Sequence, residues 1–239
     1  MRRFNIASIL PLMMLGLSPW PATVGAQPAQ QPTMQERVGA MKKSMMQSQQ
    51  ALRQYEWIET TVVFMKGEEK SSTQKRCYYG VDGKVEKVPL APPPEQEKKG
   101  GIRGKIAEKK KAELTDYMKQ AVQLVHSYVP PNQELIEKAK DAGNASVEIL
   151  DPGKRIALAF KDYQVSGDSL KIEMTLADNR LAGISVSTLL ENKSEKDPVT
   201  LDVSMGTLDD GTTYSQETVL QAPAKELKVV ITNSGYRKQ

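Results

Sequence analysis

Residues 199–205, with the sequence VTLDVSM, alternate between apolar and polar side chains, and the same alternation returns at Leu227, Val229 and Ile231. A period of two is typical of a β-strand with one buried and one solvent-facing side. Strands of this kind follow one another through the C-terminal part of the chain, and a turn-forming stretch with Gly, Pro, Asn or Asp separates each from the next. We predict strands over residues 155–165, 169–177, 181–190, 199–208, 212–221 and 225–232.

Three further strands are predicted upstream. Residues 56–66 are rich in β-branched and aromatic side chains, and residues 74–79 and 84–88 flank Val81-Asp82-Gly83. Asp-Gly between two such runs is a strong hairpin signal. The whole sequence therefore predicts about nine strands in an antiparallel meander.

A helix is predicted just before the first strand. Thr33 and Glu36 have the spacing of a capping box, and an apolar stripe follows to about Gln54. The stripe consists of Met34, Val38, Met41, Met45, Leu52 and Tyr55. We interpret it as a core-facing stripe, with a Met-rich surface that adapts to varied ligands as the alternative.

A helical insert is predicted over residues 106–143, after an exposed loop at residues 89–105 that is rich in Pro and Gly. Pro130 and Pro131 divide the insert, and Asn132 caps its second helix. An antiparallel sheet must cover its apolar side, and these helices are the available cover. We therefore predict an α+β fold: one domain over residues 34–239 in which a curved sheet, or half-barrel, carries the N-terminal helix and the helical insert on one face.

The N-terminus has the features of an export signal. Arg2 and Arg3 precede an apolar run at residues 6–17, and Val24-Gly25-Ala26 provides small residues for cleavage. The run is shorter than the roughly 20 residues of a membrane span, which disfavours the alternative of an uncleaved anchor. We predict a signal peptide over residues 1–26 that is cleaved after Ala26, a mobile tail at 27–33, and a soluble periplasmic protein exported by the Sec route.

Composition excludes several classes of function. The chain has 239 residues, of which 33 are Lys or Arg and 29 are Asp or Glu. Loss of Arg2 and Arg3 leaves 33 − 2 = 31 basic residues, and a net charge of +2 provides no basis for nucleic-acid binding. One Cys and one His exclude a disulfide framework and a Cys/His zinc site. We expect no metal and no cofactor.

Two residues are candidates for nucleophilic chemistry. His126 is the single imidazole, and Cys77 lies beside Lys75 and Arg76, whose charges favour a thiolate. No G-x-S-x-G elbow is present, and the residues beside His126 are those of a helix end. Free cysteines are among the most buried residues, so inert burial of Cys77 is the preferred interpretation. We predict no catalytic residue.

A cluster of basic residues spans the end of the exposed loop and the start of the insert. It has the composition to bind anionic lipid headgroups or an acidic envelope protein. Glutamates interleave with it, which favours a solvated loop and helix face instead. The cluster contains Lys98, Lys99, Arg103, Lys105, Lys109, Lys110 and Lys111.

The order of elements resembles a known group. An exported helix leads into residues 52–57, LRQYEW, and a hairpin through residues 79–84, YGVDGK, precedes the insert and the meander. This order is similar to the half-barrels of the bacterial lipoprotein carriers LolA and LolB and of the RseB sensor domain. The resemblance implies a concave apolar cavity that is covered by helices and receives acyl chains or lipoproteins. Because the single cysteine, Cys77, is far from the cleavage site, the chain resembles the soluble carrier more than the lipid-anchored acceptor.

The leading hypothesis is a non-enzymatic periplasmic protein that binds an apolar ligand, a lipid or a lipoprotein, in a half-barrel cavity. The alternatives are an envelope scaffold that uses the basic residues of 98–111, and a hydrolase that depends on His126 or Cys77. The candidate cavity residues are Trp57, Val63, Met65, Leu227, Val229 and Ile231.

Overall fold

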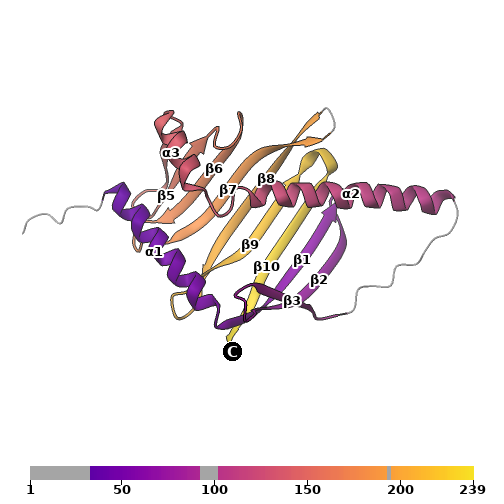
Figure 1. Cartoon of the computed structure of the whole chain (residues 1–239), viewed down its shortest axis with the longest axis horizontal. Coiled ribbons are helices and arrows are strands. Elements are labelled where there is room, and N and C mark those ends of the chain that lie inside the picture. The colour runs from indigo at the N-terminus through magenta and orange to yellow at the C-terminus, as the bar shows by residue number, and fades with distance from the viewer. Residues whose placement is uncertain (1–32, 92–101, 193–194) are drawn as a thin grey trace, which may run out of the picture. The chain divides into compact units, whose positions relative to one another are not determined.

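A computed structural model describes residues 33–91, 102–192 and 195–239 of the chain. Within these residues, ten antiparallel strands form one sheet in the order β3-β2-β1-β10-β9-β8-β7-β6-β5-β4. The sheet is curved and unclosed, with β3 and β4 as its edges (Figure 1). The strands are β1 (Tyr55–Met65), β2 (Glu68–Tyr79), β3 (Val85–Pro89), β4 (Ala145–Asp151), β5 (Arg155–Lys161), β6 (Ser169–Thr175), β7 (Leu181–Asn192), β8 (Glu195–Thr207), β9 (Thr213–Ala222) and β10 (Leu227–Lys238).

The α+β half-barrel predicted from the sequence is confirmed, with ten strands where about nine were predicted. The additional strand is β4, which lies between the helical insert and the first predicted strand of the meander. It pairs with β5, so that Val147 lies opposite Leu158 and Ile149 opposite Ile156. The alternation of Val147 and Ile149 is a strand pattern, but it extends over only a few residues before Asp151 and the turn that follows.

In the part of the chain that the structure describes, three helices lie across one side of the sheet (Figure 1). They are α1 (Met34–Leu52), α2 (Ile102–His126) and α3 (Gln133–Asp141), and a short 3₁₀ turn, Pro223–Lys225, joins β9 to β10. Met41 of α1, Tyr117 and Ala121 of α2, and Ala139 of α3 belong to one buried apolar cluster with the sheet. The helices therefore cover the apolar side of the sheet. We call this side of the sheet the helix-covered face.

The helix ends follow the predicted capping with one change of boundary. The Thr33 hydroxyl accepts a hydrogen bond from the Glu36 N–H, and the Glu36 carboxylate accepts one from the Thr33 N–H, which completes the capping box. Asn132 Oδ1 accepts from the Glu134 N–H at the start of α3. Helix α2 begins at Ile102 and not at residue 106, so the end of the predicted loop is helical, and residues 92–101 of that loop lie outside the described residues.

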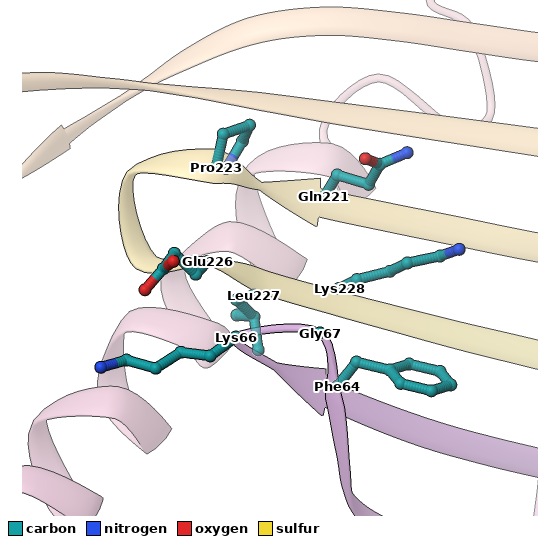
Figure 2. Close-up of a pocket in the computed structure, with 8 residues that line it drawn as sticks. All are labelled: Phe64, Lys66, Gly67, Gln221, Pro223, Glu226, Leu227 and Lys228. Atoms are coloured by element: carbon teal, nitrogen blue, oxygen red, sulfur yellow. The ribbon is translucent and has the colours of Figure 1, made fainter.

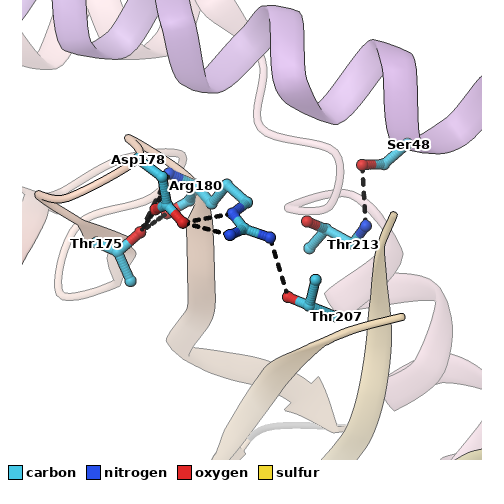
Figure 3. A network of polar contacts seen from close by, with 6 residues as sticks. All are labelled: Ser48, Thr175, Asp178, Arg180, Thr207 and Thr213. Carbon is cyan, nitrogen blue, oxygen red and sulfur yellow. Dashed lines mark hydrogen bonds and ion pairs between the residues drawn. The ribbon is translucent and has the colours of Figure 1, made fainter. Parts of the chain in front are cut away.

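Helix α1 is held on the sheet by apolar and polar contacts. Met41 is buried, and Val38 and Met45 pack half-buried against the same cluster, so the middle of the predicted apolar stripe faces the core. Met34 at its start is exposed, and Tyr55 at its end belongs to β1 because α1 stops at Leu52. Ser48 Oγ accepts a hydrogen bond from the Thr213 N–H at 3.0 Å. Figure 3 shows this contact beside a second polar group, in which Arg180 pairs with Asp178 and donates to the hydroxyl of Thr207. The Ser48 contact holds the C-terminal half of α1 against the first residue of β9.

Candidate functional site

The helix-covered face carries rows of apolar side chains that cross many strands. Residues that lie directly opposite each other on neighbouring strands point to the same side of the sheet. Following these partners from strand to strand therefore traces continuous rows from β1 to β4. The first row is Val63, Val229, Leu220, Leu201, Val186, Leu170, Phe160 and Ala145. The second row is Thr61, Ile231, Thr218, Val203, Ile184, Ile172, Leu158 and Val147.

Five of the six candidate cavity residues meet on the β1 and β10 part of this face. The register pairs Val63 with Val229 and Met65 with Leu227, and Ile231 is the next apolar position along β10. Leu227 is 2% exposed and Val229 is 7% exposed, whereas Val63, Met65 and Ile231 are only half-buried. The covered core therefore ends within this group, between β10 and β1.

Trp57, the sixth candidate, lies elsewhere on the face in an aromatic cluster. Its ring stacks on that of Tyr236 with centroids 5.5 Å apart, and the tilted ring of Tyr79 has its centroid 5.8 Å away. Its indole N–H donates to Asn233 Oδ1 at 3.1 Å. The buried indole is thus fully engaged in packing, and sequence reasoning had no means to separate it from the group around Val63.

A buried charge on the same face escaped the sequence analysis. Glu59 is 9% exposed, and its Oε2 lies 2.5 Å from Nζ of Lys87 on β3. Burial of a carboxylate is costly without such a partner. The signal was present in the alternation, since Glu59 occupies the apolar phase of β1 between Trp57 and Thr61.

An open cavity of about 490 Å³ lies where β1 and β10 end (Figure 2). Leu227 contributes to its lining, while the ring of Phe64 lies 6.0 Å from the Lys228 ammonium. The Lys66 N–H donates to the Glu226 carbonyl at 2.9 Å and holds the two neighbouring turns together. The remaining lining residues are Gly67, Gln221 and Pro223. The cavity has a mixed, mostly exposed lining, and Leu227 is the single candidate residue that reaches it.

Of the two residues considered for nucleophilic chemistry, the structure describes the side chain of Cys77 only. Cys77 is fully buried, and burial, with the charge of Glu59 second, raises the pKa of its thiol. This confirms inert burial as the preferred interpretation of Cys77. His126 is the last residue of α2, and its side chain is not among those described. Among the described residues, no group of three or more His, Cys, Asp or Glu side chains is placed to hold a metal ion.

The basic cluster is only partly described. Lys98 and Lys99 lie outside the described residues, and the other five belong to the N-terminal half of α2. The side chain of Lys109 is exposed. Within the described part of the chain, no helix combines the length and apolar character needed to cross a membrane.

Comparison with known proteins gives structural likeness only. No family model matches the chain, and no curated protein matches its sequence. A DUF1329 family protein from Desulfovibrio piger is 11% identical, with a TM-score of 0.40 over 85% of this chain and 93% of that one. A LolA superfamily protein from Nitrosomonas europaea is 7% identical, with a TM-score of 0.35 over 83% of this chain and 93% of that one.

A third solved structure is a domain from Vibrio parahaemolyticus that is assigned to outer membrane lipoprotein sorting. It is 8% identical, with a TM-score of 0.34 over 84% of this chain and 93% of that one. The LolA superfamily, which the order of sequence elements resembles, is therefore represented among the structures similar to this chain.

Proposed function

We propose that the chain is a non-enzymatic protein of the cell envelope that binds an apolar ligand, a lipid or the lipid-modified end of a lipoprotein, on the β1 and β10 part of the helix-covered face. One observation carries the proposal. The apolar side chains of this face continue past the covered core to Val63, Met65 and Ile231, which remain half-buried. Apolar surface of this kind gains about 25 cal/mol for each Å² that a ligand removes from water.

The same face has other features that suit an acyl chain. Val203 and Met205 of β8 are also half-buried and pack at the margin of the core. Met45 of α1 and Met118 of α2 join that margin from the helix side. Methionine side chains are flexible and adapt to irregular apolar partners. The ligand surface is therefore bounded by adaptable side chains on both the sheet and the helices.

The described chemistry offers little to a hydrolase. The Cys77 thiol is buried and its pKa is raised, so the thiolate required of a nucleophile is disfavoured. Asp210, which belongs to the acidic turn at 209–211, accepts hydrogen bonds from the Tyr55 hydroxyl and the Thr212 N–H. This carboxylate serves a turn and a strand contact, which supports a binding role over a catalytic one.

Export to the periplasm is part of the proposal. Cleavage after Ala26 leaves 239 − 26 = 213 residues that begin at Gln27. Expression of the full chain in a Gram-negative host, followed by intact-mass measurement of the periplasmic protein, tests this step. A mass that includes residues 1–26, or recovery only with the membranes, would contradict it.

Native mass spectrometry of that periplasmic protein, with extraction of any bound lipid, tests the binding function. We expect a reproducible adduct with the mass of a phospholipid or acyl chain that is absent from an exported control protein treated identically. Protein without an adduct that also takes up no added phospholipid would overturn the proposal. Capture of an envelope protein by such ligand-free material would instead favour the scaffold alternative.

A further inference from the structure

Strand β4, at the edge of the sheet, exposes a group of large apolar side chains. Val147 is 51% exposed, Ile149 is 71% exposed and Leu150 is 40% exposed. Val147 ends the second apolar row of the helix-covered face, and Ile149 lies opposite the buried Ile156. The apolar rows therefore run off the edge of the sheet into solvent.

No strand of the described residues pairs with the outer side of β4. The Lys161 N–H donates to the Asn144 carbonyl at 2.9 Å, so the backbone groups of Asn144 point toward β5. In an antiparallel ladder every second residue points to the same neighbour, so Ser146 and Glu148 also point toward β5. The N–H and C=O groups of Val147 and Ile149 therefore point away from β5. An edge with free backbone groups and apolar side chains is a template for another strand.

The two edges of the sheet differ in how they are protected. Glu86, Lys87 and Pro89 interrupt the five-residue strand β3, and charges and proline are the usual means of blocking strand addition. In β4 the central charge is Glu148, whose carboxylate lies 2.8 Å from Nζ of Lys171 on β6. This ion pair draws the carboxylate inward over β5, so the edge itself is left unprotected.

We propose that β4 is the site at which two copies of this chain pair, edge to edge and antiparallel, to form one continuous sheet. A two-fold axis at Glu148 places Val147 opposite the second copy's Ile149, and both positions have outward-pointing backbone groups. The pairing satisfies these groups and extends the apolar rows from one copy into the next. Two-fold, self-complementary contacts are the commonest form of protein dimer.

Sedimentation of the purified periplasmic protein under reducing conditions, over a range of concentrations, tests the pairing. We expect a concentration-dependent dimer in the unmodified chain and loss of that dimer in Ile149→Lys. The matched control is Met46→Lys, because Met46 is 70% exposed and lies on α1, which packs chiefly on β9 and β1. A monomer at every concentration, or a dimer that survives Ile149→Lys, would overturn the proposal.

Disulfide trapping tests the register. In this register, Glu148 faces Glu148 of the second copy across the axis. The two form a non-hydrogen-bonded pair with Cα atoms about 4.5 Å apart, a separation that a disulfide can span. Glu148→Cys should therefore give a covalent dimer under mild oxidation, whereas Ser146→Cys should not, since residue 146 faces the second copy's Leu150. Trapping at 146 in place of 148, or at neither, would contradict the pairing described.

Discussion

Val63 of β1 lies directly opposite Val229 of β10, and the two side chains mark the boundary of the covered core. Val229 is 7% exposed, while Val63 is half-buried although both belong to the same apolar row. Val229 is a member of the buried apolar cluster, whereas Val63 packs against that cluster and stays partly exposed. The proposed ligand surface begins at this boundary.

Asp168 should be the most sensitive single position outside the apolar core. Its carboxylate is 3% exposed and accepts hydrogen bonds from the Tyr128 hydroxyl and from three backbone N–H groups at residues 163–165. Asp168→Ala leaves the three backbone donors unpaired, while the Tyr128 hydroxyl keeps Thr188 Oγ1 at 2.7 Å, so we expect the free energy of unfolding to fall by about 3 kcal/mol. Urea denaturation measures it, with the exposed Asp202→Ala as a control expected to change by less than about 0.5 kcal/mol. Equal effects in the two variants would refute this role.

The contact between Ser48 and Thr213 should stabilise the docking of α1. Both residues are buried, and Ser48→Ala leaves the Thr213 N–H without its acceptor. We expect a loss of about 1–2 kcal/mol in the free energy of unfolding, measured by chemical denaturation. Ser44→Ala, one turn earlier on the same helix, is the control and should have little effect. A neutral Ser48→Ala would show that water or another group replaces the hydroxyl.

The pair of Tyr55 and Asp210 should be visible in an acid titration. The Tyr55 hydroxyl donates to Asp210 Oδ2 at 2.6 Å, and this bond holds the pKa of the Asp210 carboxyl well below its usual range. A carboxyl with a lowered folded pKa stabilises the fold above its unfolded pKa, about 3.9, and loses that contribution as pH falls through the folded value. NMR titration of the Asp210 carboxyl should show an upward pKa shift in Tyr55→Phe. An unchanged pKa would mean that the hydrogen bonds from Thr212 and the charge of Lys238 set it without Tyr55.

The Cys77 thiol should react only when the fold opens. It is fully buried, and burial raises its pKa. We expect a thiol reagent to modify the native protein very slowly and the urea-unfolded protein completely, with intact mass as the readout. Labelling of the native chain at the rate of an exposed thiol would show that β2 and β3 separate readily at this position.

The architecture was predictable from the sequence because strand periodicity and turn residues are local signals. The capping residues Thr33 and Asn132 and the hairpin at 81–83 are of this kind. Strand β4 was missed because its pattern is short and its partner, β5, follows an additional turn. The grouping of Val63 with Val229 was expected from alternation, but the separation of Trp57 from them depends on aromatic packing between distant strands.

The most direct test of the proposed function compares Val63→Asp with Val62→Asp. The two valines are adjacent in β1 and both are half-buried, but they point to opposite sides of the sheet. Native mass spectrometry of each exported, folded variant gives the fraction that carries a lipid adduct. We predict that the fraction with a lipid adduct falls about tenfold or more in Val63→Asp and stays that of the unmodified chain in Val62→Asp. The reason is that a buried charge opposes ligand binding only on the side of the sheet that the ligand covers. Equal lipid loads in the two folded variants would contradict a ligand surface on the helix-covered face.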